Sequence, residues 1–255
     1  TAEPVDRRRD VTLPDPVEEG RRLVAEANDV GVPARLVGGV AVRLRAPCIA
    51  DADPPRTYHD IDLAADRRTS RELAALLEAH GYEPHHRFNT LAGDRLLFAD
   101  DANGRRLDVF LDRIAMCHTL DFRERLTRDP ETLCVADLVL SKLQIVELTD
   151  RDVADLAALF AEHSLSDDGG IDPSVIEEVC CSDWGWWRTA TGNLKSLIES
   201  WSRETGAAGP DRTRAAANAA ELLDRLERAP KTMRWKLRAR IGERATWYQE
   251  PEEVR

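Results

Sequence analysis

Two aspartates stand one residue apart in an otherwise apolar stretch, and this spacing constrains the fold of the chain more than any other feature. In "RTYHDIDL", residues 56–63, Asp60 and Asp62 are separated by Ile61. Side chains alternate across a strand, so the two carboxylates share one face while Ile61 and Leu63 take the other. Close carboxylates repel each other and lose hydration unless a cation or hydrogen bonds compensate. The stretch is therefore either a strand with one wet face or a strand whose aspartates hold a divalent metal.

Length, charge and cysteine content bound the class of protein. The 255 residues suffice for one large domain or two modest ones. The formal net charge of -11 argues against broad nonspecific binding to nucleic acid or anionic membrane, because both need a basic surface. No apolar run approaches the roughly 18 to 20 residues of a membrane helix. No secretory signal is visible and the five cysteines are scattered, so we expect a cytoplasmic protein with reduced thiols and no membrane partner.

The beginning of the chain reads as helix, strand and helix. A helix is predicted over residues 15–31, because Asp15 is a suitable N-cap and Gly31 a suitable stop. A short buried strand over 34–39 then runs into a glycine pair. The stretch 39–46 predicts a short helix that starts at that pair.

The next part of the chain carries most of the expected strands. The prolines of "PCIADADPP", residues 47–55, predict a loop without regular structure. A helix is expected over 69–81, with Thr69 and Glu72 as a capping box. After the strand that holds the aspartate pair, three further strands are predicted over residues 84–91, 94–100 and 105–113.

From residue 136 onward the pattern becomes helical. Two helices are expected over 136–148 and 150–163, joined tightly, followed by a hinge-like break over 166–173. The rest of the chain is predicted to be helical. The expected fold class is thus α/β (α+β): a small mixed sheet with flanking helices in a domain of residues 1–165, then an all-helical domain of residues 166–255.

A glycine pair and three aspartates suggest a phosphate and metal site. Gly38 and Gly39 lie between a strand and a helix, where backbone N–H groups and the helix N-terminus cradle anions. Asp60, Asp62 and, on a later strand, Asp108 place three carboxylates beside that cradle. Magnesium prefers oxygen ligands and takes one or two carboxylates together with substrate phosphates. Two magnesium ions fit this set, and such a pair can clamp the attacking and leaving oxygens of an in-line displacement.

The order of these motifs resembles the DNA polymerase beta-like nucleotidyltransferase superfamily. The matching stretches are "VGG", "HDIDL" and "LDVF". The chain looks closest to the abortive-infection toxin type nucleotidyltransferases and their uncharacterised bacterial relatives, in which a helix bearing a lysine precedes an Arg-Asp-x-x-Asp-Leu helix. Lys142, Asp152 and Asp155 occupy those positions, and the resemblance covers roughly residues 34–162. The spacer between the glycine pair and the aspartates is longer than the family usually shows.

The resemblance implies a magnesium-dependent nucleotidyltransferase with the nucleotidyltransferase fold. Such an enzyme moves a nucleoside monophosphate from a nucleoside triphosphate to an acceptor hydroxyl and releases pyrophosphate. It implies that Asp60 and Asp62 hold both ions, that Asp108 binds one and accepts the proton of the acceptor, and that Gly38 and Gly39 bind the nucleotide. The acceptor stays open between tRNA, a protein and a small molecule, with an antitoxin-like partner possible. The alternative is a non-catalytic nucleotide-binding or toxin-system member of the same fold.

Two residues assigned to nucleotide binding also have a purely structural interpretation. Lys142 would be a point charge on the triphosphate, or else a lysine that extends along an apolar helix toward water. Asp152 would belong to the nucleotide site, or else cap the helix in whose first turn it lies. Arg56 could touch phosphate, although a loop arginine usually faces solvent.

Two stretches of the C-terminal half suggest further binding. Three tryptophans in "DWGWW" are interpreted as core or interface residues rather than stacking platforms: Trp184, Trp186 and Trp187. The basic stretch 231–244 is either a phosphate-binding patch or a solvated helix.

Overall fold

A five-stranded mixed sheet forms the centre of the N-terminal half in the computed structural model, which describes residues 12–52, 55–91, 93–203 and 208–250. The strands are β1 (Ala34–Val37), β2 (Asp60–Ala65), β3 (Glu83–Pro84), β4 (Arg95–Asp100), β5 (Arg105–Leu111) and, in a separate hairpin, β6 (Arg113–Ala115) and β7 (Thr119–Asp121). The sheet order is β1-β2-β5-β4-β3, with β2 and β5 parallel and every other neighbouring pair antiparallel. The predicted mixed α/β class is therefore confirmed, and so is the helical C-terminal region.

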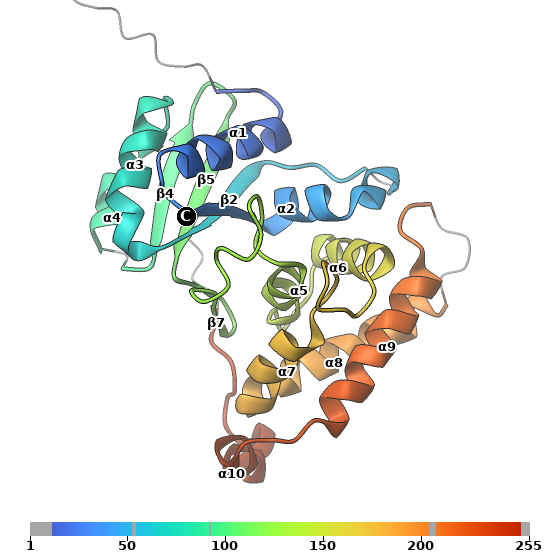
Figure 1. The fold of residues 1–255 in the computed structure, drawn as a ribbon. Helices are drawn as coiled ribbons and strands as arrows, with labels where there is room; N and C mark the ends of the chain where they lie inside the picture. Colours follow the sequence, from blue (N-terminus) through green and yellow to red (C-terminus); the bar gives the residue numbers. More distant parts are fainter. Residues whose placement is uncertain (1–11, 53–54, 92, 204–207, 251–255) are drawn as a thin grey trace, which may run out of the picture.

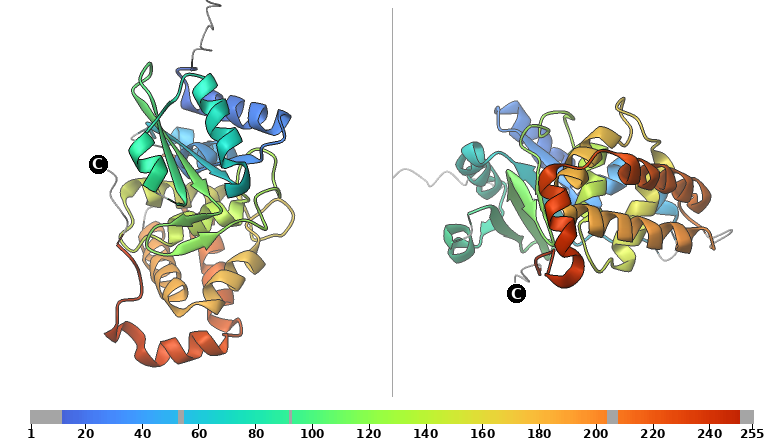
Figure 2. Two further views of the ribbon diagram at one scale, coloured as in Figure 1. Left: turned by 90° about the vertical axis from the view of Figure 1, so that its left-hand side faces the viewer. Right: turned by 90° about the horizontal axis from the view of Figure 1, so that it is seen from below.

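Helices lie on both sides of this sheet and form most of the described C-terminal half. They are α1 (Pro16–Asp29), α2 (Gly38–Arg45), α3 (Ser70–Ala79), α4 (His86–Leu91), α5 (Val135–Leu143), α6 (Asp150–Glu162), α7 (Pro173–Ser182), α8 (Trp184–Trp201), α9 (Arg212–Arg228) and α10 (Met233–Ile241), with 3₁₀ turns η1 (Pro47–Asp51), η2 (Arg67–Thr69) and η3 (Gly242–Arg244). Figures 1 and 2 show α1 and α3 on one side of the sheet and the C-terminal helices on the other.

The two central strands bury one face and present the aspartates on the other. Ile61, Leu63, Leu107 and Val109 are fully buried. Burial of each such side chain contributes roughly 1.5–3 kcal/mol to folding, so this face fixes the register of β2 against β5. Because side chains alternate, the same register turns the aspartates of both strands to the opposite face.

The predicted first helix is confirmed together with its ends. The Asp15 carboxylate accepts hydrogen bonds from the backbone N–H groups of Val17 (2.7 Å) and Glu18 (2.9 Å). Gly31 lies two residues beyond the helix with φ +77°, a left-handed conformation in which glycine avoids the cost of a Cβ.

The prediction of a strand over 84–91 was wrong, because most of it forms α4. The Nδ1 atom of His85 accepts a hydrogen bond from the backbone N–H of Phe88 (3.2 Å) and so starts the helix. Asn89 bonds through its side-chain amide to both the N–H and the carbonyl of Leu97 (2.8 and 3.1 Å). A side chain thus replaces the backbone pairing that a strand would have supplied, which no pattern of apolar residues signals.

Two smaller predictions also need correction. The stretch 47–55 contains the 3₁₀ turn η1, since a proline is compatible with the first turn of a helix, while its residues 53–54 lie outside the described residues. Thr69 precedes α3, but its side chain caps nothing. Its hydroxyl donates to the carbonyl of Asp66 (3.2 Å), because η2 leads directly into α3.

Helix α5 ends at Leu143, five residues before the predicted end at residue 148. The side-chain amide of Asn193, on α8, donates to the carbonyls of Leu143 (3.0 Å) and Ile145 (2.8 Å). These bonds satisfy carbonyl groups at the helix end, so the chain can leave the helix there without an unpaired buried acceptor.

The C-terminal helices pack against α5 and α6, and α10 lies farthest from the sheet (Figure 1). The side chain of Asn218, on α9, donates to the carbonyls of Phe160 (2.8 Å) and His163 (3.1 Å) at the end of α6. The final described segment returns to the hairpin, where the N–H of Gln249 donates to the carbonyl of Cys117 (2.9 Å). The division at residues 165 and 166 stays a prediction, and residues 1–11 and 251–255 lie outside the described chain.

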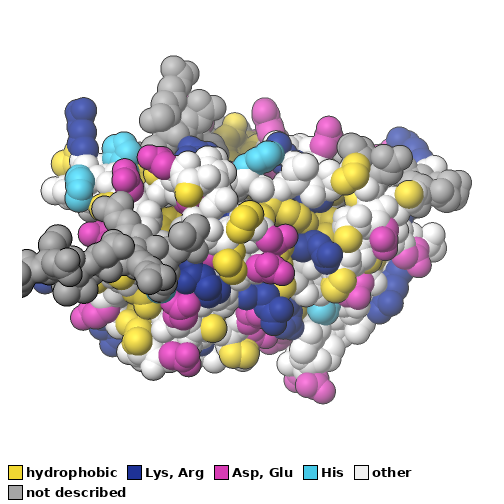
Figure 3. All heavy atoms as spheres, turned by 90° about the horizontal axis from the view of Figure 1, so that it is seen from above, with side chains coloured by type: hydrophobic (Ala, Val, Ile, Leu, Met, Phe, Trp, Pro, Cys, Tyr) yellow, Lys and Arg dark blue, Asp and Glu magenta, His cyan; other side chains and the backbone are white. Residues whose placement is uncertain are grey.

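The described surface carries charges of both signs. On the face shown in Figure 3, acidic and basic side chains are interspersed among the described residues, without a broad basic area. None of the helices in the described residues has both the length and the apolar character needed to cross a membrane.

Candidate active site

The predicted glycine pair forms the first two residues of α2, immediately after β1. Gly38 has φ +69°, a conformation that L side chains rarely adopt. A Cβ added there would lie 2.9 Å from Cγ of Asp62 and closer still to the carboxylate oxygen Oδ2. The carboxylate of Asp62 therefore lies directly against the backbone of the glycine pair, and only glycine leaves room for it.

Strand register places two of the predicted aspartates beside each other. Asp62 is the Cα partner of Val37 on β1 and of Asp108 on β5, so it lies between the glycine turn and Asp108. Asp60 lies two residues earlier on β2, opposite Arg106. The Nε atom of Arg106 is 3.5 Å from Oδ1 of Asp60. The side chain of Asp60 is 42% exposed, which leaves Asp60 at the solvent edge of the site.

Asp108 is buried, and only one of its two carboxylate oxygens has a partner among the described residues. Its Oδ2 pairs with Nη2 of Arg95 on β4 (2.9 Å), while its Oδ1 has no hydrogen-bond partner in the described structure. Burial raises the pKa of the Asp108 carboxyl, and the positive charge of Arg95 works against that rise. An unsatisfied buried carboxylate oxygen is costly, so Oδ1 is suited to a cation or a proton donor.

The environment of Asp62 disfavours its charged form. Burial is the largest cause and the charge of Asp108 adds to it, so that the pKa of Asp62 rises to about 7. Lys142 and Arg95 act in the opposite direction. The environment of Asp62 thus favours retention of a proton, at a position where a bound cation would compete with that proton.

Lys142 and Asp152 come together, but their contacts are with each other and with the helix. The Nζ of Lys142 is 3.0 Å from Oδ1 of Asp152 and 2.8 Å from Oδ2 of Asp155. Asp152 also completes a capping box with Thr149 at the start of α6, as the structural interpretation predicted. Lys142 does not extend toward water, because its side chain is 15% exposed and its ammonium is paired on two sides. A nucleotide role for either residue stays a prediction.

Arg56 lies beside the glycine pair, one of the two positions that its place in a loop left open. Its side chain is 13% exposed, and a Cβ on Gly39 would lie 2.8 Å from its Nη2. Asp155 holds the guanidinium through Nε (3.2 Å) and Nη2 (3.4 Å), and the ring of Tyr58 lies 5.2 Å below it. A signal for this pairing exists in the sequence. Asp155 lies in the apolar run of α6, and a buried carboxylate of that kind needs a cationic partner.

The set fits magnesium in the manner usual for that ion. Among the described residues, no group of three or more His, Cys, Asp or Glu side chains is arranged to hold a metal ion. Magnesium is commonly bound by one or two carboxylates together with substrate phosphates, so a preformed cage is not required. The unpartnered Oδ1 of Asp108 and the carboxylate of Asp62, packed on the glycine backbone, supply oxygen ligands of the right kind.

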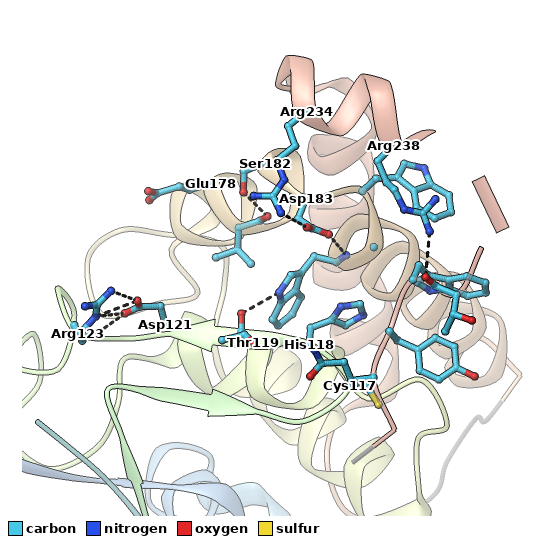
Figure 4. Close-up of a pocket in the computed structure, with 18 of the residues that line it drawn as sticks. Cys117, His118, Thr119, Asp121, Arg123, Glu178, Ser182, Asp183, Arg234 and Arg238 are labelled. Atoms are coloured by element: carbon cyan, nitrogen blue, oxygen red, sulfur yellow. Dashed lines mark hydrogen bonds and ion pairs between the residues drawn. The ribbon is translucent and has the colours of Figure 1, made fainter. Parts of the chain in front are cut away.

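A cavity of about 1090 Å³ lies elsewhere, between the β6–β7 hairpin, the junction of α7 and α8, α10 and the returning C-terminal segment (Figure 4). Trp184 and Trp186 are buried in its wall, as the interpretation of core residues predicted. His118 also lines it, with Nε2 2.9 Å from Oγ1 of Thr189, and burial lowers its pKa to about 4. The cavity carries arginines and carboxylates in equal number, and none of the three predicted aspartates lines it.

Part of the basic stretch 231–244 is occupied by structural contacts. Lys231 donates to the carbonyls of Leu226 (2.7 Å) and Ala229 (2.5 Å), and Arg238 donates to those of Gly242 (2.7 Å) and Ala245 (2.8 Å). Both cations satisfy the ends of helices, which weakens the interpretation of a phosphate-binding patch.

No protein-family model matches the chain, and no curated protein matches it.

Proposed function

We propose that the chain is a magnesium-dependent nucleotidyltransferase with the nucleotidyltransferase fold of the DNA polymerase beta-like superfamily. One observation carries the proposal. The carboxylate of Asp62 lies against the backbone of Gly38, and Asp108 stands beside Asp62 in strand register. Paired carboxylates next to a side-chain-free helix start bring metal ligands and phosphate donors to one place.

The N-terminus of α2 is available to a phosphate. Its N-cap is Val37, which supplies no side-chain hydrogen bond, whereas α1 and α6 are capped by Asp15 and Thr149. The first N–H groups of α2 therefore lack the side-chain acceptor that the other two helices have. The glycines keep the approach to these groups free of a Cβ, so the backbone can donate to a triphosphate.

The three aspartates share one task in this proposal, and one of them has a second. Asp60, Asp62 and Asp108 would hold the magnesium ions. When bound, magnesium would neutralise phosphate charge and lower the pKa of the acceptor hydroxyl. Asp62 must be ionised to act as a ligand. Asp108, whose Oδ2 is held by Arg95, offers its free Oδ1 to the proton of the acceptor.

The acceptor is left open between a tRNA end, a protein hydroxyl and a small hydroxylated molecule. The interspersed charges of Figure 3 and the structural roles of Lys231 and Arg238 do not supply the broad basic surface on which RNA binding usually depends.

Thermal stability in the presence of nucleotide tests the proposal. We expect each of several nucleoside triphosphates, or one of them selectively, to raise the melting temperature of the protein only when magnesium is present. Asp62→Asn should abolish that increase, while Asp15→Asn, which keeps an N-cap acceptor on α1, should leave it intact. A rise that is equally large in the Asp62 variant would exclude Asp62 as a ligand.

A further inference from the structure

Arg56 and Lys142 are held side by side by one buried carboxylate. Oδ1 and Oδ2 of Asp155 contact Nε and Nη2 of Arg56, and Oδ2 also contacts Nζ of Lys142 (2.8 Å). Asp155 is fully buried, and the three residues come from α6, from the segment before β2 and from α5. A single anion thus fixes two cations that belong to distant parts of the chain.

Arg56 lies at the positive end of a helix. Nη2 of Arg56 is 2.8 Å from the position of a Cβ on Gly39, in the first turn of α2. Positive charge at a helix N-terminus is unfavourable, because the helix dipole already places a partial positive charge there. Asp155 and Asp62 already offset part of this positive charge, and an anion that joins Arg56 and the N–H groups of α2 would offset more of it.

Both cations keep donors for such an anion. A guanidinium has five N–H groups. Arg56 uses three of them, two on Asp155 and one on the carbonyl of Thr57 (2.7 Å). An ammonium has three, and Lys142 uses one each on Asp152 and Asp155. The contacts with described residues leave two N–H groups of Arg56 and one of Lys142, which is a suitable set for the oxygens of one phosphate group.

We infer that Asp155 is a positioning residue that holds Arg56, together with Lys142, as a preformed clamp for the terminal phosphates of a polyphosphate chain. Asp155 does not touch the ligand. Without Asp155, Arg56 loses the two hydrogen bonds that orient its guanidinium, and Lys142 keeps only its ion pair with Asp152. The identification of that chain with the tail of a nucleoside triphosphate rests on the proposed function, whereas the clamp itself rests on these contacts.

The test is the binding of inorganic tripolyphosphate, measured by calorimetry at fixed ionic strength and without metal. We expect the parent protein to bind it, and we expect Arg56→Gln to weaken binding roughly ten- to a hundredfold, the loss of one or two charge-assisted hydrogen bonds. Asp155→Asn should weaken it by a similar factor. Because Asp155 acts partly through Arg56, the losses should be less than additive: the double variant should bind more tightly than the product of the two single losses predicts.

A matched control separates positioning from general destabilisation. Asp137 is also fully buried and pairs with an arginine, Arg125 (2.7 Å), at the other end of α5. Asp137→Asn should lower the melting temperature about as much as Asp155→Asn, yet keep the parental affinity for tripolyphosphate.

Each result decides the inference. Unchanged affinity in folded Asp155→Asn would overturn it, and tighter binding would show that Asp155 competes with the anion instead of positioning the cations. Independent, additive losses in the double variant would also contradict it. Because no transfer is measured, a parent protein that binds tripolyphosphate through Arg56 but transfers no nucleotide would retain the clamp and reject only the proposed enzyme.

Discussion

The carboxylate of Asp62 occupies the space that a side chain on Gly38 would need. A Cβ on Gly38 would lie 2.9 Å from Cγ of Asp62, and the backbone of Gly38 has φ +69°. A glycine is therefore required at position 38 for two reasons: its backbone conformation, and the space that the carboxylate of Asp62 occupies beside it. This contact ties the glycine pair and the aspartates of β2 into one structural unit.

Gly38→Ala should damage this unit more than a glycine substitution at a comparable backbone conformation elsewhere. Gly104 has φ +59° with nothing within 4 Å of an added Cβ, so Gly104→Ala reports the conformational cost alone. That cost is about 1–2 kcal/mol. Gly38→Ala should lose more stability, since Asp62 must also move, and should lose magnesium-dependent triphosphate binding. Chemical denaturation of both variants measures the difference, and equal losses would show that Asp62 is not packed on Gly38.

The stability of the metal-free protein should fall as pH rises through the range in which Asp62 ionises. In the unfolded chain an aspartate ionises near pH 3.8, whereas in the folded protein the pKa of Asp62 is about 7. Between these values the folded state holds a proton that the unfolded state has lost, so folding stability decreases with pH and levels off above about 7. Below about pH 4 both states are protonated and this contribution vanishes.

Asp62→Asn removes this dependence and should therefore be more stable than the parent at pH 8, by an amount on the order of a few kcal/mol at most. Urea denaturation at pH 5 and pH 8 without magnesium measures it. The two proteins should differ much less at pH 5. A variant that is less stable than the parent at pH 8 would contradict the raised pKa. With magnesium present, affinity for the metal–nucleotide complex should rise between pH 6 and pH 8.

Asp108→Asn should separate nucleotide binding from transfer. The substitution keeps the size of the side chain and removes the charge opposite Arg95. Triphosphate binding should fall modestly, while transfer should drop at least roughly a hundredfold, the loss expected when a general base is removed. Single-turnover transfer and equilibrium binding, measured on the same preparation, give the two numbers. Near-parental transfer would assign the base to another residue.

Asp152 has a helix-capping role that can be separated from any role at the nucleotide. Thr149→Ala removes the side-chain half of the capping box and leaves the contact between Asp152 and Lys142 in place. It should cost about 1 kcal/mol of stability and leave triphosphate affinity unchanged. Asp152→Ala should cost at least as much stability and, if Asp152 belongs to the site, should change the affinity as well. Equal triphosphate affinities in both variants would leave helix capping as the role of Asp152.

Sequence reasoning could reach those parts of the site that depend on strand and helix periodicity. The alternation in "HDIDL" was enough to predict that Asp60 and Asp62 share one face of a strand, and the register of β2 against β5 places Asp108 on that face as well. The glycine pair at a strand–helix junction was predicted for the same reason. These features follow from local geometry, which a short window of sequence contains.

The remaining parts depend on contacts between distant segments. Arg56 lies 99 residues from Asp155 along the chain, and the loop that carries it has no periodic pattern from which its direction could be inferred. The end of α5 depends on Asn193, 50 residues further on, and α4 forms where Asn89 bonds to β4. Arg95 could not be assigned to Asp108 from sequence, because both lie on strands whose pairing register had to be known first.

Transfer of label from a nucleoside triphosphate tests the central claim most directly. The protein would be incubated with magnesium, cell extract as a source of acceptors, and each of the four triphosphates labelled on either the α- or the γ-phosphate. The account predicts that α-label becomes attached to an acceptor while γ-label is released as pyrophosphate, that omission of magnesium stops both, and that Asp62→Asn and Asp108→Asn lack the activity. Transfer of γ-label to the acceptor would identify a different reaction. Magnesium-dependent triphosphate binding with no transfer to any acceptor would contradict the enzyme and favour a nucleotide-binding protein of the same fold.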